Sequence, residues 1–153
     1  MRHLVVLFLS TMVLSFIVNC KNNASEGPAK TTPPDAVKTS STNCYLAVLT
    51  QDSIWMKLTI NGLQVEGELN YLFYEKDKSR GRMTGSLQGD TLFARYTFMA
   101  EGTESGREVA FLKKGNNWVE GYGEMDMETG TRFKNKQSLD FNSKTILKPV
   151  PCN

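Results

Sequence analysis

The stretch from Arg82 to Lys114 alternates apolar and polar side chains with a period of two residues, RMTGSLQGDTLFARYTFMAEGTESGREVAFLKK. This is the period of a β-strand with one buried face, whereas a helix would repeat about every 3.6 residues. The alternation is interrupted at Gly89-Asp90 and again over 101–106, where residues that favour turns gather, because several turn positions need a positive φ. The stretch therefore predicts three antiparallel strands joined by two turns.

The chain after residue 43 repeats this arrangement. The predicted strands cover 44–50, 54–60, 63–74, 82–88, 91–100, 107–113, 118–125 and 132–141, and Ile146-Leu147 predicts a short closing segment. Short strands with hairpin-sized connections predict an all-β domain over 44–153, an antiparallel up-and-down meander of about eight strands. We expect the meander to close into a small barrel, because an open sheet leaves two bare edges that promote aggregation. A β-sandwich is the alternative.

Two cysteines lie near the ends of this domain. A disulfide between Cys44 and Cys152 would bring the first strand and the end of the chain together, as closure of a barrel requires. Two free structural thiols are the alternative. Glycines within the predicted strands also favour closure, because they mark bends and bulges at which a sheet coils. They are Gly67, Gly81, Gly85, Gly121 and Gly123.

Six aromatic and methionine side chains fall on the predicted inward face of the sheet. They are Met56, Tyr71, Phe73, Met83, Tyr96 and Phe98. One interpretation is a packed core, since side chains just fill a barrel of eight strands. The other is an apolar ligand cavity, in which the tyrosine hydroxyls would anchor a small molecule.

The predicted domain lacks most of the groups that carry out catalysis. His3 is the single histidine and precedes the domain, so the domain offers no imidazole as a base or as a metal ligand. The acidic pairs Asp126/Glu128 and Glu101/Glu104 could perform acid–base chemistry or bind calcium, but they lie in turns, and neither pair has the calcium-loop spacing. We therefore predict no enzymatic activity, no metal and no cofactor.

The first 19 residues have the pattern of a secretory signal peptide. A positive start at Arg2 precedes the apolar run from Leu4 to Val18, which is shorter than the roughly 20 residues of a membrane-spanning helix. The segment 14–20, LSFIVNC, resembles the lipobox of bacterial lipoproteins, although Asn19 stands where Gly, Ala or Ser is more usual. The resemblance implies that Cys20 carries a lipid and becomes the mature N-terminus. A third disulfide partner or a free thiol is the alternative for Cys20.

The segment 20–43 has no hydrophobic period and is rich in Pro, Ser, Thr, Asn and Lys. Such a segment buries too little apolar surface to offset its chain entropy, so we expect a flexible tether behind the lipidated Cys20. The formal net charge is only +2, and no basic run with interleaved aromatics appears. We therefore expect the membrane as a partner through the lipid, and no nucleic acid.

The chain resembles a family of small lipoproteins from Bacteroidota in its lipobox, its tether and the stretch GDTLFARYTFMAEGTESGREVAFLKKG. The resemblance implies a place in the bacterial cell envelope and implies no activity. The meander is similar in architecture alone to lipocalin-like and avidin-like barrels. Asp52-Ser53-Ile54 and Asp90-Thr91-Leu92 resemble the sites at which Bacteroidota attach O-glycans, which makes Ser53 and Thr91 candidates; ordinary turn chemistry is the alternative.

Together these patterns predict a non-enzymatic, lipid-anchored and monomeric binding module of the cell envelope. Its partner would be a small apolar ligand or an envelope protein. A protein partner would need an exposed apolar patch, for which Trp55, Phe93 and Trp118 are candidates. The alternatives are an envelope protein that inhibits an enzyme and an enzyme that acts on glycans through carboxylates.

Overall fold

The computed structural model describes residues 40–75 and 78–152. The predicted signal peptide, Cys20 and most of the predicted tether lie outside these residues. The strands are β1 (Ser40–Leu49), β2 (Asp52–Asn61), β3 (Gln64–Leu72), β4 (Ser79–Gln88), β5 (Thr91–Ala100), β6 (Thr103–Lys114), β7 (Asn117–Gly121) and β8 (Ile146–Val150), and a short 3-10 helix, η1, covers Lys136–Ser138.

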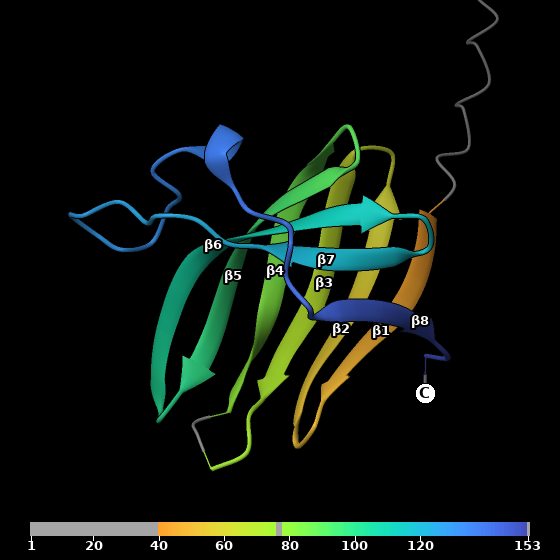
Figure 1. The fold of residues 1–153 in the computed structure, drawn as a ribbon, viewed down its shortest axis with the longest axis horizontal. Helices are drawn as coiled ribbons and strands as arrows, with labels where there is room; N and C mark the ends of the chain where they lie inside the picture. The colour runs from red at the N-terminus through yellow and green to blue at the C-terminus, as the bar shows by residue number, and fades with distance from the viewer. Residues whose placement is uncertain (1–39, 76–77, 153) are drawn as a thin grey trace, which may run out of the picture. The chain divides into compact units, whose positions relative to one another are not determined.

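Each strand pairs antiparallel with the next, and β8 pairs with β1, so that the sheet closes on itself as a barrel (Figure 1). The predicted all-β meander of eight strands is therefore confirmed, and the single closed sheet excludes the β-sandwich. β1 begins at Ser40, which pairs with Asn61, four residues before the predicted start of the domain. The wall is uneven, because β1 to β6 are long and β7 and β8 are short.

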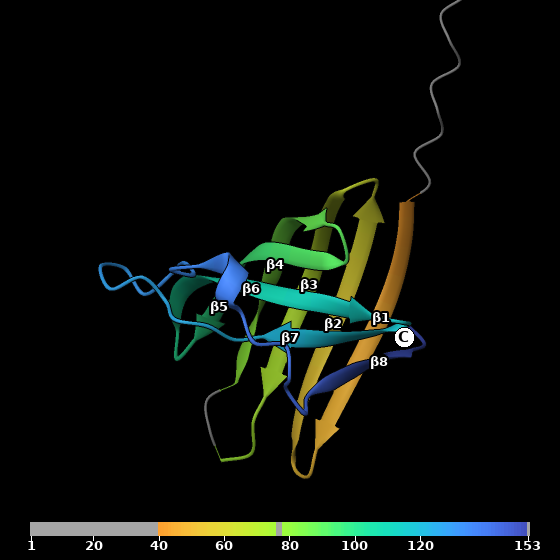
Figure 2. The same ribbon diagram turned by 45° about the horizontal axis from the view of Figure 1, so that its top comes forward.

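The predicted strand over 132–141 is wrong. β7 ends at Gly121, and the chain then leaves the barrel, passes through η1 and returns as β8 at Ile146, which is the predicted closing segment. Figure 1 and Figure 2 both show this excursion, residues 122–145, extending beyond the sheet. Only isolated bridges pair its two arms, Tyr122 with Asp140 and Met125 with Phe133. Its apolar side chains pack over the outside of β7, where a Cβ on Gly121 would meet the ring of Phe141.

The turn between β5 and β6 is shorter than the predicted 101–106. Glu101 (φ 50°) and Gly102 (φ 78°) form it alone, and β6 starts at Thr103. Two successive residues with positive φ twist a two-residue hairpin in the same sense as its strands. The register therefore continues to the end of the hairpin, where Ala100 pairs with Thr103.

Alternate residues of the strands fill the interior. Met56, Leu58, Leu69, Leu92 and Phe111 are all fully buried. The aromatic rings continue this core towards one end of the barrel, where Tyr96 stacks on Phe98 with ring centroids 4.8 Å apart and meets the edge of Tyr71 at 5.8 Å. In β6 the inward face carries Val109 and Phe111, whereas Ala110 is buried on the outside, where it pairs with Gly121.

Two glycines show how the sheet coils tightly enough to close. Gly81 and Gly85 of β4 occupy inward positions opposite Phe98 and Ala94 of β5. A Cβ at either glycine would lie 2.6 Å from the Cα atom of that partner and closer still to a backbone carbonyl oxygen. Only glycine permits this approach of the two backbones. At these positions the strand glycines allow β4 and β5 to approach closely, and the pairing runs through both without a bulge.

The disulfide joins Cys44 of β1 to Cys152, with Cα atoms 5.2 Å apart and a sequence separation of 108 residues. It lies beside the pairing of Cys44 with Val150, at the place where the last strand meets the first. The predicted pairing of these cysteines is confirmed. The bond holds the end of the chain against the strand that begins the barrel.

Candidate ligand-binding site

A carboxylate lies inside the barrel wall at the end of β7. Glu120 is only 4% exposed and takes an inward position two residues after the buried Trp118. The Tyr71 hydroxyl donates to its Oε1 atom at 2.5 Å, and the Tyr122 hydroxyl donates to its Oε2 atom at 2.9 Å. Buried acidic groups need such donors, because an unpaired buried carboxylate is very unfavourable.

An arginine lies beside this carboxylate on the neighbouring strand. Arg107 of β6 is exposed, and its guanidinium carbon lies 5.4 Å from the ring centroid of Tyr71 and 5.9 Å from that of Phe98. A cation over aromatic faces is attracted by the ring quadrupole, which fixes the guanidinium near the end of the barrel. Tyr71 thus contacts both charged groups, Arg107 through its ring and Glu120 through its hydroxyl.

The surroundings shift the titration of the acidic groups in this cluster. Burial raises the pKa of Glu120 above its ordinary 4.5, while the two tyrosine hydroxyls and Arg107 act in the opposite direction. Burial, followed by the adjacent Glu120 charge, raises the pKa of Tyr71 and of Tyr122 above 10.0. Both tyrosines therefore keep their protons and act as hydrogen-bond donors at neutral pH.

Replacement of Glu120 by Gln is expected to change how stability depends on pH. Because burial raises the folded pKa of Glu120, the folded state holds its proton over a range in which the unfolded state has lost it. This stabilisation is complete below pH 4.5 and is lost as the pH rises through the folded pKa. Each unit of pKa elevation corresponds to about 1.4 kcal/mol. The wild type should therefore lose stability relative to Glu120→Gln between acidic and neutral pH.

Urea unfolding of both proteins at several pH values measures this difference, because the other titrating groups are common to them. Glu66→Gln is the matched control, since it removes an exposed carboxylate of β3 from the outer wall. Its stability should follow the wild type across the range. Parallel curves for Glu120→Gln and the wild type would contradict the account of Glu120.

A pocket of about 220 Å³ opens beside this cluster, between β6, β7 and the start of the excursion. Arg107, Glu108 and Glu120 supply its charged lining, and Tyr122 adds a hydroxyl. Val109, Met125 and Phe133 supply apolar walls. A concave site with apolar walls and a few convergent polar groups is the usual form of a small-molecule site.

The excursion that forms the outer wall of this pocket is held in place by polar contacts. The Asp126 carboxylate accepts bonds from the backbone N–H groups of Thr129, Thr131 and Arg132 and from the Thr129 hydroxyl. These donors lower the pKa of Asp126, with the Thr129 backbone N–H as the largest cause. Asp126 therefore organises a turn, and its carboxylate is already saturated with donors.

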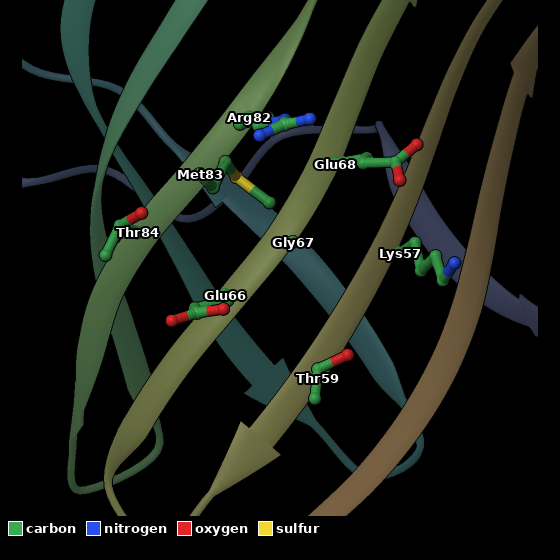
Figure 3. A pocket seen from close by; sticks show the side chains of 8 residues that line it. All are labelled: Lys57, Thr59, Glu66, Gly67, Glu68, Arg82, Met83 and Thr84. Carbon is green, nitrogen blue, oxygen red and sulfur yellow. The ribbon is translucent and has the colours of Figure 1, made fainter.

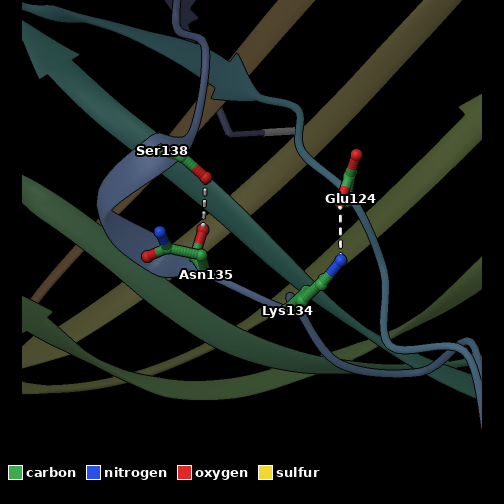
Figure 4. A network of polar contacts seen from close by, with 4 residues as sticks. All are labelled: Glu124, Lys134, Asn135 and Ser138. Carbon is green, nitrogen blue, oxygen red and sulfur yellow. Dashed lines mark hydrogen bonds and ion pairs between the residues drawn. The ribbon is translucent and has the colours of Figure 1, made fainter.

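Further contacts anchor the returning arm of the excursion. Figure 4 shows the Lys134 ammonium paired with Glu124 at 3.2 Å, and the Ser138 hydroxyl donating to the backbone oxygen of Asn135 at 3.1 Å. Lys136 pairs with Glu108 of β6 at 3.0 Å, and the Phe133 backbone N–H donates to the same glutamate. The wall of the pocket is thus attached to β6 beside Arg107.

A second hollow, of about 420 Å³, lies on the outer face of β2, β3 and β4 (Figure 3). Lys57, Glu68 and Arg82 stand side by side there as cross-strand neighbours of alternating charge. Such pairs are ordinary on a solvated sheet face and contribute little binding energy. The smaller pocket at Glu120 is the better candidate, because it combines apolar walls with a buried charge.

The structure places the six predicted lining residues inside the barrel. Met56, Tyr71, Met83 and Tyr96 are buried, and Phe73 and Phe98 are half-buried and packed against them. Ser53 in β2 and Thr91 at the start of β5 are half-buried strand residues. Glu101 and Glu104 lie exposed at the β5–β6 hairpin, remote in sequence from Glu120.

The sequence-based proposal that Trp118 belongs to an exposed apolar patch is wrong, because Trp118 is only 1% exposed and packs edge-on against Tyr45. Trp55 and Phe93 are half-buried.

Sequence reasoning does not find Arg107 and Glu120. The available signal is the alternation in β7, which places Glu120 on the same face as Trp118. An acidic residue on a face that begins with tryptophan conflicts with an apolar interior, and such a conflict often marks a functional position.

Comparison with known proteins finds no matching family model, no similar curated protein and no similar solved structure. Among residues 40–75 and 78–152, no helix is long and apolar enough to cross a membrane. The candidate site therefore rests on its own geometry.

Proposed function

We propose that this protein is a non-enzymatic binding module that takes a small molecule into the pocket between β6, β7 and the excursion. The observation that carries the proposal is the combination of a buried carboxylate, Glu120, with the exposed guanidinium of Arg107 in one apolar-walled pocket. Polar groups of this kind orient a ligand, and the apolar walls supply binding energy. The packed core behind them provides a rigid support.

The geometry favours binding over catalysis. Tyr71 and Tyr122 hold the two oxygens of Glu120, and the raised pKa values of both tyrosines keep them protonated at neutral pH, so neither is available as a base. Asp126, a member of a predicted acidic pair, is engaged by backbone donors. A glycan-active enzyme would need two carboxylates facing one substrate bond, and the second carboxylate of this pocket, Glu108, is engaged by Lys136 and by the Phe133 backbone N–H.

The location in the proposal comes from the first 20 residues. The lipobox resemblance supports a lipid on Cys20, and the following segment would serve as a tether that holds the barrel at a membrane of the bacterial cell envelope. Fractionation of a Cys20→Ser variant tests this part, because the variant should leave the membrane fraction. Retention there would contradict lipidation.

Blocking the pocket tests the binding proposal. A fragment library is screened by NMR against the full chain carrying Cys20→Ser, and binders should shift the amide signals of Val109, Gly121 and Tyr122. Met125→Trp fills the pocket and should abolish these shifts. Met127→Trp adds the same bulk at a side chain that is 94% exposed and lies outside the lining, so it should leave them unchanged. Absence of binders, or binders insensitive to Met125→Trp, would contradict the proposal.

A further inference from the structure

Of the three charged residues that line the pocket, Glu108 is paired with Lys136, whereas Arg107 and Glu120 form no ion pair with each other. The ion pairs in the described part of the chain join Lys134 to Glu124 and Lys136 to Glu108, and neither involves Arg107 or Glu120. Tyr71 separates the two groups. The guanidinium of Arg107 lies over its ring, and the carboxylate of Glu120 accepts from its hydroxyl.

Both groups have hydrogen-bonding capacity left. A guanidinium has five N–H donors, and within the described residues Arg107 has only the Tyr71 hydroxyl as a side-chain acceptor, so most of its donors are free. A carboxylate offers about four acceptor positions, of which the two tyrosines use one on each oxygen of Glu120. The pocket therefore presents a set of free donors and a set of free acceptors at separate points of its lining.

We infer that the pocket binds a small zwitterion of the α-amino-acid type, with its carboxylate on Arg107, its ammonium on Glu120 and an apolar side chain against Val109, Met125 and Phe133. The inference rests on the proposed function and specifies its ligand class. The volume of about 220 Å³ is below the roughly 300–1,000 Å³ of pockets for drug-sized molecules, which fits a molecule as small as an amino acid.

Charge complementarity selects this class over the simpler ones. An anion on Arg107 would lie near the Glu120 carboxylate and be repelled by it. A cation on Glu120 would meet the guanidinium in the same way. A neutral apolar ligand would cover both charges and leave them without partners, which is unfavourable. A molecule that carries both charges a few bonds apart satisfies both groups.

The test compares amino acids with analogues that lack one charge. L-leucine, L-methionine and L-phenylalanine are titrated by NMR into the full chain carrying Cys20→Ser. 4-Methylpentanoate is leucine without the amine, and 3-methylbutylamine is leucine without the carboxylate. At least one amino acid should shift the pocket amides, and the two leucine analogues should bind about tenfold more weakly than leucine or worse, as expected for one lost charge-assisted interaction.

Two variants assign each charge to its partner. Arg107→Met should bring leucine down to the affinity of 3-methylbutylamine, because the carboxylate then has no partner. Glu120→Gln should bring leucine down to that of 4-methylpentanoate. Arg95→Met is the control for loss of an exposed cation, since Arg95 lies on the outer face of β5 and outside the pocket lining. Arg107 is exposed, so its variant keeps the test decisive even if Glu120→Gln fails to fold.

The outcomes separate the two ideas. Binding of none of the three amino acids, or equal binding of leucine and its analogues, overturns the zwitterion inference. If fragments nevertheless bind in the pocket of the parent protein and fail to bind to the Met125→Trp variant, the proposed function stands with another ligand class. If nothing binds there, both fail.

Discussion

Replacement of both Cys44 and Cys152 by serine is expected to lower the free energy of unfolding by about 4–5 kcal/mol. The bond closes a loop with a sequence separation of 108 residues, and opening such a loop returns a large amount of conformational entropy to the unfolded chain. A domain of this size has a total stability on the order of 5–15 kcal/mol, so the loss is a large part of it. Urea unfolding monitored by tryptophan fluorescence measures the change.

The comparison is made in a chain that already carries Cys20→Ser, so that no third thiol can form a mixed disulfide. Reduction of the parent protein should lower its stability by the same amount as the double substitution, because both treatments remove the same constraint. A change below about 1 kcal/mol in both would contradict a structural role for the bond.

Gly81→Ala is the second large effect that we expect, a loss of about 3 kcal/mol, at the upper end of the range for overpacking. The added Cβ would lie 2.6 Å from the Cα atom of Phe98 and closer to the carbonyl oxygen of Thr97. Both atoms belong to the backbone of β5, so relief requires the two strands to separate at the point where the sheet coils. Thermal unfolding followed by circular dichroism measures the loss.

Gly106→Ala is the matched control. Gly106 also lies within a strand, but there a Cβ would meet the guanidinium end of Arg95, with its Nη2 atom at 2.7 Å, and this flexible side chain can move aside. The control should stay within about 1 kcal/mol of the wild type. Similar losses at both positions would show that strand glycine as such, rather than close approach of β4 to β5, determines the effect.

The strands of the barrel could be predicted because each has one buried face. In β2 the burial alternates from Ile54 to Leu58, as the two-residue period of the sequence predicts. Glycine-containing turns at Gly62 and Gly89, both with positive φ, fix the boundaries of four hairpin strands, β2 to β5. The disulfide could be predicted because closure brings the two ends of the domain to the same place.

The structure of segment 132–141 could not be predicted in this way. Its apolar residues have the spacing of a strand, but they pack against the outside of the barrel. Leu139 and Phe141 cover the glycines after and within β7, Gly123 and Gly121, from outside the barrel. A two-residue period of apolar side chains indicates that one face of the segment is buried, but it does not indicate what buries it. Tertiary packing determines whether the segment is a strand of the barrel wall or part of the excursion outside it.

The candidate site could not be predicted from the sequence for a similar reason, because local patterns do not determine which face of a strand is buried. Arg107 and Glu120 look like the outward residues of a barrel wall, because charged side chains are ordinarily solvated. Their inward placement depends on the register of β6 and β7, in which Phe111 pairs with Glu120, and on Tyr71 from the distant β3. No local pattern contains that meeting of three strands.

The two short strands, β7 and β8, form the place in the barrel wall that opens most easily. β7 and β8 pair only at Trp118–Leu147 and Val119–Ile146, whereas β5 and β6 pair along their whole length. Separation of β7 from β8 breaks few hydrogen bonds, so it requires far less free energy than global unfolding, while the disulfide keeps the chain end on β1. The seam between β7 and β8 is therefore the part of the wall that opens at the lowest free energy, and β7 carries Glu120.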